Sequence, residues 1–481
     1  MRELTQLAID TAVSNGASYA DIRIIESKTE NISTKNGDIN YLNKSSILGY
    51  GIRVIVNGSW GFASSPYVTK NEIRRTAIKA VNIAKASATL RKSGIILANE
   101  PVHQDLWTSP YLINPFKISV EEKLNLLYKI DKILRKDEKI KSAVCLMSFW
   151  NEHQWLANSE GTFIEQDLLR SGTGYTATAV EGSEVQVRSY PSSHGGQFKQ
   201  MGYELILSTP LVENAERVRE EAIALLSAPD CPNGKKDVII GSDQLALQIH
   251  ESIGHPSELD RVIGMEANYA GTSFITTDLY KNFHYASPIV NVVADATVPT
   301  GLATFGYDDD GVRAQRYHII QNGLYKHYLT NRELAHIVGD ERSRACNRAD
   351  GYNNIPMIRM INMSLMPRQG SLDELINDTK DGIYIETNKC WSIDQKRLNF
   401  QFTTEIGWEI KNGKKVRIIK NPTYQGITPE FWQSCDAICG KDEWILWGVP
   451  NCGKGQPGQT AEISHGAAPS RFRKVTVGIS K

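Results

Sequence analysis

Two histidines and a glutamate lie close together in the segment 248–256, which reads QIHESIGHP. Neutral imidazole nitrogens bind zinc, and a carboxylate beside such a ligand can take a proton from a water molecule at the metal. The residue types of His250, Glu251 and His255 therefore predict a metal site that carries its own general base. A chance match on a surface helix is equally consistent with these three residues alone.

The spacing of the two histidines differs from that of the common H-E-x-x-H motif, in which four residues separate them along one helix face. Here the step is five residues, which on an α-helix rotates His255 about 140° away from His250. Gly254 can end a helix in the left-handed conformation, and Pro256 disfavours helical backbone at the residue before it. We therefore predict that His250 and Glu251 lie in the last turns of a helix. His255 should lie beyond the helix end and turn back toward the metal.

A third ligand is required, because a catalytic zinc ion usually has three protein ligands and one open position. Cys452 lies in the glycine-rich segment 451–459, NCGKGQPGQ, and Cys439 begins a similar segment, CGKD. A thiolate binds zinc tightly, although a single cysteine is more often a small buried apolar residue. Position in the chain leaves the choice between Cys452 and Cys439 open.

Two other polar segments could serve a site. The acidic run Asp308–Asp310 offers carboxylate oxygens, which hard cations prefer, but Gly311 follows directly and favours a solvated loop or a structural turn. The segment Gly271–Ser273 could offer backbone groups to a substrate, although an ordinary turn is the preferred interpretation.

The elements that must position these residues follow from periodicity, capping and turn signals. Helices are predicted at 2–14, after the capping pair Thr69 and Glu72, after Ser119, and at 211–227. Asn57-Gly58 predicts a hairpin turn. Strands are predicted at 20–33, 39–43, 46–56, 60–64, 142–149, 154–157, 162–168 and 171–180, with a proline-containing linker at 91–118.

The helix that carries the histidines should begin at Ser242, a good N-cap, after a buried strand at 237–240. Leu245, Ile249 and Ile253 repeat every four residues and should face the core. His250 and Glu251 fall beside this stripe and should therefore face a cleft.

Most later segments are typical of strands joined by turns. We therefore predict an α+β fold, in which N-terminal helix and β-meander units precede a mainly antiparallel β C-terminal domain that carries the metal-site helix. Three domains are predicted: an N-terminal α+β domain with its linker at 1–110, a central α+β domain at 111–230, and the C-terminal domain with the metal site at 231–481.

Composition excludes some classes of partner. Lysine and arginine total 54, as do aspartate and glutamate, so the 481-residue chain has no net charge and is not expected to bind nucleic acid directly. No segment approaches twenty apolar residues, and the N-terminus lacks the apolar run of a signal peptide. We therefore expect no membrane contact and a cytoplasmic location, with the 7 scattered cysteines as reduced thiols.

Several motifs together resemble one family. The segment 250–274, HESIGHPSELDRVIGMEANYAGTSF, looks like the signature of the TldD branch of the TldD/PmbA family of zinc-dependent peptidases. The segments 308–329, 343–362 and 451–459 also resemble family motifs and occur in the family's order. The N-terminal unit is similar more loosely, so the resemblance spans nearly the whole chain.

The resemblance implies a role for each candidate residue. His250 and His255 would bind Zn²⁺, Glu251 would be the base, and the cysteine of the Cys-Gly-Lys motif would be the third ligand. Cys452 is preferred because NCGKGQP is the closer match and the family-like segment 464–473, SHGAAPSRFR, follows it.

The implied function is hydrolysis of peptides or unfolded polypeptide segments by a zinc-dependent peptidase, with Glu251 activating a water molecule at the metal. The family also implies a dimer, either of two identical chains or with a PmbA-like subunit. The alternative is a non-catalytic regulatory or binding subunit of such a complex, in which the metal is structural.

Overall fold

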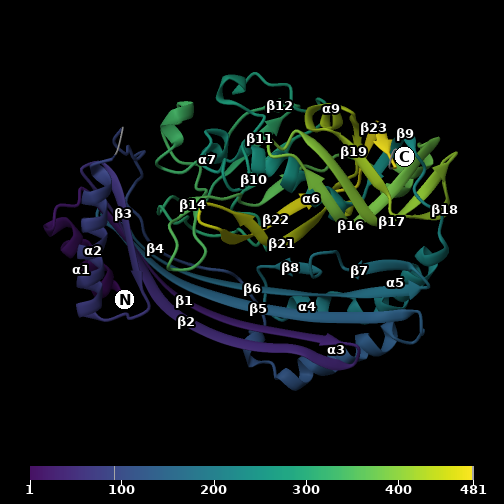
Figure 1. The fold of residues 1–481 in the computed structure, drawn as a ribbon, viewed down its shortest axis with the longest axis horizontal. Coiled ribbons are helices and arrows are strands. Elements are labelled where there is room, and N and C mark those ends of the chain that lie inside the picture. The colour runs from purple at the N-terminus through teal and green to yellow at the C-terminus, as the bar shows by residue number, and fades with distance from the viewer. Residues whose placement is uncertain (91–92, 479–481) are drawn as a thin grey trace.

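The structure is a computed structural model that describes residues 1–90 and 93–478. Figure 1 shows a long curved sheet, built by the first half of the chain, and a compact β-rich part, built by the second half, which lies along the concave side of the sheet. The predicted α+β fold is therefore confirmed, with helix and meander units followed by a mainly antiparallel β domain. Among the described residues, no helix is both long and apolar enough to span a membrane.

The curved sheet has eight strands and brings together segments that are far apart in the sequence. Antiparallel pairing of β1 with β5 joins residues 21–35 to residues 144–158, so one sheet runs through both predicted N-terminal units. The domain boundaries near residues 110 and 230 stay a prediction. The strand order is β3 (Ser59–Ser65), β2 (Asp38–Val56), β1 (Tyr19–Lys35), β5 (Ile140–Asn158), β6 (Phe163–Glu181) and β4 (Gln104–Thr108), with β7 (Glu184–Tyr190) and β8 (Gln197–Lys199) also paired to β6.

Helices pack on this sheet through two apolar clusters, one at each end of the long strands. Two predicted caps are confirmed: the Thr69 side chain accepts a hydrogen bond from Glu72 N at 3.4 Å, and the Ser119 side chain accepts one from Glu122 N at 3.1 Å. The helices are α1 (Arg2–Ser14) and α2 (Lys70–Ala88) at one end, and α3 (Val120–Leu134), α4 (Glu204–Ser208) and α5 (Leu211–Ser227) at the other.

The predicted strands of this region have the correct positions but are too short. Residues 39–43 and 46–56 belong to β2, and the four predicted strands between 142 and 180 merge into β5 and β6. A glycine usually weakens a strand, but Gly172 is needed inside β6 because an added Cβ would lie 1.9 Å from the Phe198 ring. The predicted linker contains β4, which pairs in parallel with β6, and its residues 91 and 92 lie outside the described part of the chain.

The main sheet of the C-terminal part closes on itself, because β17 pairs with both β19 and β16. The β9–β16 pair is parallel and the other pairs of this sheet are antiparallel, as the mainly antiparallel prediction requires. The strands are β16 (Asp381–Ile393), β9 (Gly234–Ile240), β23 (Ser470–Val477), β19 (Thr423–Ile427), β17 (Asn399–Lys411) and β18 (Lys414–Lys420), with β20 (Cys435–Ile438) paired to β23.

Short helices, small sheets and one hairpin complete this part.

The apolar stripe of α6 is confirmed, since Leu245, Ile249 and Ile253 are fully buried in the largest apolar cluster. Ser242 is not the N-cap, however. Gly241 holds that position, and the Ser242 hydroxyl accepts a hydrogen bond from Trp447 Nε1 at 3.0 Å instead. The elements are α6 (Ser242–Ile249), α7 (Leu259–Val262), α8 (Leu372–Asn377), α9 (Thr428–Gln433), β10 (Val292–Asp295), β11 (Arg316–Gln321), β12 (Leu324–Tyr325), β13 (Asn347–Arg348), β14 (Met357–Ile358), β15 (Met363–Leu365), β21 (Ile445–Lys454) and β22 (Gln459–Ala467).

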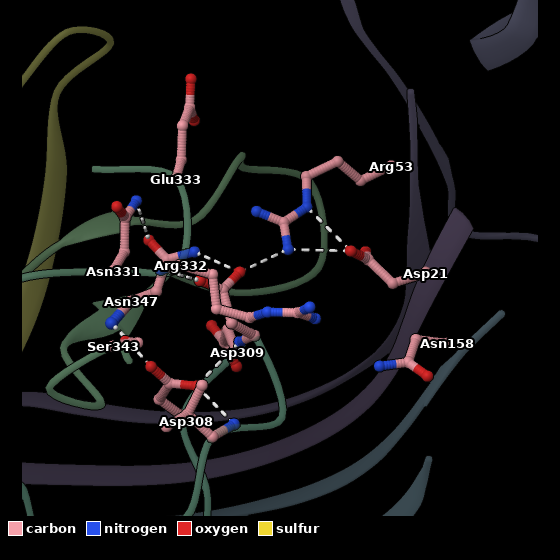
Figure 2. A network of polar contacts seen from close by, with 12 residues as sticks. Asp21, Arg53, Asn158, Asp308, Asp309, Asn331, Arg332, Glu333, Ser343 and Asn347 are labelled. Carbon is pink, nitrogen blue, oxygen red and sulfur yellow. Dashed lines mark hydrogen bonds and ion pairs between the residues drawn. The ribbon is translucent and has the colours of Figure 1, made fainter. Parts of the chain in front are cut away.

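A buried ion-pair network joins the curved sheet to the C-terminal part (Figure 2). Arg53 of β2 lies 2.8 Å from the Asp21 carboxylate and 2.7 Å from that of Asp310, and Arg23 of β1 lies 3.1 Å from Asp309. The acidic run 308–310 is therefore not a solvated loop. It is a structural element in which arginines of the neighbouring sheet compensate the charges of Asp309 and Asp310, while Asp308 accepts hydrogen bonds from backbone N–H groups.

Candidate metal centre

The two histidines lie on one continuous helical segment that changes its winding. α6 ends at Ile249, and a π-helical turn follows at His250–Gly254. The backbone N–H of His255 donates to the carbonyl oxygen of His250, five residues earlier. A π-helical turn therefore absorbs the extra residue of the motif, and such turns are frequent at functional sites.

The predicted chain reversal at Gly254 is wrong. Gly254 has φ −64° and ψ −69°, and His255 keeps helical angles of φ −56° and ψ −42° even though Pro256 follows it. Gly254 is instead required by close packing, because an added Cβ would lie 2.0 Å from the Met360 sulfur. The wider turn brings His255 back beside His250, with their ring centroids 4.9 Å apart, without ending the helix.

Cys452 joins the two histidines from β21, about two hundred residues later in the chain. Ligand atoms of His250, His255 and Cys452 all lie within 4.8 Å of one another, and all three residues are buried. Cys452 Sγ lies 3.7 Å from His255 Nε2, close to the roughly 3.5 Å that tetrahedral zinc imposes on neighbouring sulfur and nitrogen ligands. Among the residues that the structure describes, no other group of His, Cys, Asp and Glu side chains is arranged in this way.

Cys439 lies in a different apolar cluster, with Ile239, Tyr384 and Ala468. Burial raises the pKa of its thiol to about 12, so it stays protonated. Of the two cysteines that precede Gly-Lys, the fold brings only Cys452 to the histidines.

The His250 ring is oriented by a second histidine. His250 Nδ1 lies 2.8 Å from His465 Nε2, and His465 Nδ1 lies 3.1 Å from the Met363 carbonyl oxygen. Because a carbonyl only accepts, His465 carries its proton on Nδ1, and burial holds its pKa well below the usual range. His465 Nε2 therefore accepts the Nδ1 proton of His250, which leaves Nε2 of His250 free to bind a metal.

The His255 ring is oriented by a carboxylate. His255 Nδ1 donates to Glu258 Oε2 at 2.8 Å, so its Nε2 also faces the centre. Lys454 is fully buried and lies 3.3 Å from Glu258 Oε1 and 2.7 Å from Asp260. Lys454 lies two residues after Cys452 in β21, so this ion pair fixes the cysteine strand relative to the histidine helix.

The electrostatics favour metal-binding protonation states. Burial alone would raise the pKa of the Cys452 thiol, but His250 and His255 hold it well below its usual range, which favours the thiolate. Burial opposes a charge on His255, yet Cys452 and Glu258 raise its pKa to about 9. A proton on His255 and a metal ion therefore compete for the same position.

Glu251 is buried directly beside the ligands. Burial would raise its pKa, but His255, His250 and Arg397 lower it overall, so the carboxylate is ionised at neutral pH. Its Oε2 lies 3.6 Å from Arg397 Nε and has no hydrogen-bond partner among the described residues. This oxygen is thus available to accept a proton.

Sequence reasoning missed three residues of this environment. Glu258 lies three residues after His255, a helical spacing that could have indicated it. His465 lies in the family-like segment 464–473, but the resemblance gave it no role, and Arg397 has no local signal. Only the folding of β22 and of the β16–β17 turn brings these two residues near His250 and Glu251. The segment Gly271–Ser273 is a structural turn, since the Thr272 carbonyl accepts a hydrogen bond from Arg261 and the Ser273 hydroxyl donates one to the Pro256 carbonyl.

Two imidazoles and a thiolate beside a carboxylate form the donor set of a metal-dependent hydrolase. Comparison with protein-family models agrees with this class. The PmbA/TldA metallopeptidase domain 1 matches residues 20–84, the central domain matches residues 113–226, and the C-terminal domain matches residues 233–478. The chain belongs to this metallopeptidase family, as the resemblance in the sequence implies.

Relatives match over nearly the full length. A metalloprotease of Methanocaldococcus jannaschii is 31% identical over 448 residues, which is 93% of this chain and 94% of the relative. A zinc metalloprotease TldD homolog of Saccharolobus solfataricus is 27% identical over 488 residues, covering 98% of each chain. The crystal structure of TldE from Thermococcus kodakarensis has the same fold, with a TM-score of 0.74 at 16% identity over 99% of this chain and 100% of that one.

Proposed function

We propose that the chain is a zinc-dependent peptidase in which His250, His255 and Cys452 hold the metal and Glu251 is the general base. The observation that carries this proposal is the convergence of three ligand atoms within 4.8 Å of one another beside the buried Glu251 carboxylate. The donor set fits zinc, which binds imidazole nitrogen and thiolate sulfur. The relative from Saccharolobus solfataricus, described as a zinc metalloprotease, supports this choice of metal.

The residues of the metal centre have different roles in the proposed peptide hydrolysis. A bound zinc ion would polarise the scissile carbonyl and acidify a water molecule beside it. Glu251 accepts a proton from that water, since its lowered pKa keeps it ionised, and then delivers the proton to the leaving amine. His465 and Glu258 keep the two imidazoles turned with Nε2 toward the reaction centre.

The substrate is proposed to be an extended or unfolded peptide, bound along a strand edge. A cavity of about 690 Å³ between the curved sheet and the C-terminal part offers room for such a peptide, although its sheet-side wall is a face of paired strands and not an edge. Ser148 and Trp150 line it from β5, and Pro450 lines it from β21, two residues before Cys452. His194 also lines the cavity.

A non-catalytic subunit with a structural metal is the competing function. A structural zinc site is usually closed by four protein ligands, whereas the group in the described residues has three. A carboxylate beside the ligands, with one buried oxygen lacking a hydrogen-bond partner, also fits a base better than a structural side chain. Both features favour catalysis.

Replacement of Glu251 by glutamine tests the proposal. Glutamine has nearly the same size but cannot accept the proton, so Glu251→Gln should retain one zinc ion per chain and lose about 10²- to 10⁴-fold in kcat. Zinc is measured by mass spectrometry of the purified protein, and kcat is measured with internally quenched peptides. Glu216→Gln, at a glutamate whose side chain is 58% exposed, is the matched control. Wild-type peptidase activity in zinc-loaded Glu251→Gln would overturn the role of Glu251.

We also propose that the chain works as a dimer, either with a second copy or with a PmbA-like subunit. Over residues 38–49, β2 pairs with β1, and its other edge has no neighbouring strand in the described part of the chain. Ile39 and Ile47 are each 50% exposed on this segment. Free strand edges with exposed apolar side chains are common contact surfaces.

A further inference from the structure

Arg397 has an unusual backbone conformation near the metal centre. It lies in the turn between β16 and β17 with φ 63°, a left-handed angle that is costly for a residue with a Cβ. The turn is fixed from three sides: Arg397 N donates to Asp394 O, Phe274 N donates to Lys396 O, and the Thr428 hydroxyl donates to Arg397 O. Strain of this kind persists where the surrounding structure enforces it, and it clusters at functional sites.

The Arg397 guanidinium is turned toward Glu251 but is poorly satisfied. Its side chain is 14% exposed, and Nε lies 3.6 Å from Glu251 Oε2. Neither atom has a hydrogen-bond partner among the described residues. Buried polar atoms are almost always paired, and a stabilising arginine–carboxylate pair would be shorter and bidentate. A purely structural ion pair therefore does not explain Arg397.

The nearby Arg261 shows the contrast. Its guanidinium lies 2.8 Å from Glu266 and donates to the carbonyl oxygens of Thr272, Ala270 and Gln395, so its hydrogen-bonding capacity is used. Arg397 lies in the same region, but its side-chain N–H groups are not used in this way and remain available to a ligand.

We propose that Arg397 is a catalytic residue that donates hydrogen bonds to the carbonyl oxygen of the scissile peptide bond and stabilises the negative charge that develops there. The inference rests on the proposed peptidase function. A base and an oxyanion donor must flank the same carbonyl carbon, and a guanidinium 3.6 Å from the base carboxylate has that position. An arginine that instead bound the C-terminal carboxylate of the substrate would contact the next substrate residue. That residue lies about 3.8 Å further from the scissile carbonyl along the substrate chain.

The step is balanced without a change in the protonation of Arg397. The water oxygen forms a bond to the carbonyl carbon, and its proton goes to Glu251. The carbonyl oxygen gains negative charge, which Arg397 stabilises while keeping all its protons. The carbon–nitrogen bond then breaks, the proton on Glu251 passes to the leaving amine, and the carbonyl reforms.

The experiment compares Arg397→Ala, Arg397→Lys and Arg397→Gln with the wild type. We expect kcat of Arg397→Ala to fall about 10²- to 10³-fold, as for loss of one oxyanion donor, with KM and zinc affinity nearly unchanged. Arg397→Lys should recover part of the loss, and added guanidinium ion should partly restore Arg397→Ala but not Glu251→Gln. Affinity for a phosphinic peptide, a mimic of the tetrahedral intermediate, should fall by the same factor as kcat/KM. This binding is measured by calorimetry and is a readout independent of turnover.

Four outcomes would overturn the inference. The first is a wild-type kcat in zinc-loaded Arg397→Ala. The second is an unchanged maximal kcat with only the acid limb of the pH profile moved upward, which would mean that Arg397 merely lowers the pKa of Glu251. The third is a loss confined to peptides with a free C-terminus, which would indicate a carboxylate anchor. The fourth is unchanged affinity for the phosphinic peptide in whichever variant folds. An inactive wild type would instead refute the proposed peptidase function, so the two failures are distinguishable.

Discussion

His465 Nε2 accepts a hydrogen bond from His250 Nδ1 at 2.8 Å and so decides which nitrogen of His250 faces the metal centre. The pair is fully enclosed, with His465 itself fixed by the Met363 carbonyl at 3.1 Å. A histidine that orients a ligand histidine sets both its tautomer and its ring plane, and loss of such a partner usually weakens metal binding.

His465→Leu should therefore weaken zinc binding about 10- to 100-fold, measured by chelator competition. His465→Gln should lose less, because its side-chain oxygen can accept the same proton. His318→Leu, at a partly exposed histidine on β11, is the control and should leave zinc binding unchanged. A wild-type zinc Kd in folded His465→Leu would show that the packing of His250 alone fixes the ring.

Replacing each cysteine in turn should show which of the two Cys-Gly-Lys segments supplies the third zinc ligand. Cys452→Ala removes a ligand atom from a group within 4.8 Å and should reduce zinc well below one ion per chain. Cys439→Ala should keep one zinc ion, because burial holds that thiol protonated in another cluster, with a pKa of about 12. Zinc analysis of the purified variants gives the answer, and full zinc content in Cys452→Ala would exclude it as the third ligand.

Zinc affinity should depend on pH through His255. Its pKa of about 9 means that, between pH 7 and 9, zinc must displace one proton from this ring. Cys452 contributes no second proton, since its pKa is already lowered. Affinity should thus rise about tenfold per pH unit and level off above about pH 9.

Glu258→Gln provides the test of that assignment. It removes a carboxylate that raises the pKa of His255, so the affinity should level off at a lower pH. The measurement is zinc Kd by chelator competition across pH, together with proton release on binding. The assignment of the released proton to His255 would be contradicted if two protons were released per zinc ion. It would also be contradicted if zinc affinity in Glu258→Gln levelled off at the same pH as in the wild type.

The buried network between the curved sheet and the C-terminal part should be important for stability. Arg53→Met leaves Asp21 and Asp310 buried without their shared cation, and their distances to Arg53 are 2.8 and 2.7 Å. The free energy of unfolding should fall by about 3–5 kcal/mol in denaturant titrations. Lys70→Met breaks an exposed pair with Glu3 and should change it by less than about 1 kcal/mol. If both variants lowered the free energy of unfolding equally, the buried network would contribute no more to stability than an exposed ion pair does.

Local patterns in the sequence determined much of this protein. The caps at Thr69 and Ser119, the apolar stripe of α6 and the α+β class follow from short-range chemistry, which folding does not change. The residue types of His250, Glu251 and His255 also predict their chemistry directly. A family resemblance chose Cys452 over Cys439.

Tertiary structure decided what depends on distant partners. The winding between His250 and His255 is a π-helical turn, and Gly254 within it packs against Met360, a contact that lies outside any sequence window. The long strand β6 tolerates Gly172 because the Phe198 ring fills the space above it. The orientation of His250 by His465 and the approach of Arg397 to Glu251 exist only after β22 and the β16–β17 turn fold against the helix. Residue types set the chemistry that was available, and long-range packing set the geometry in which it can act.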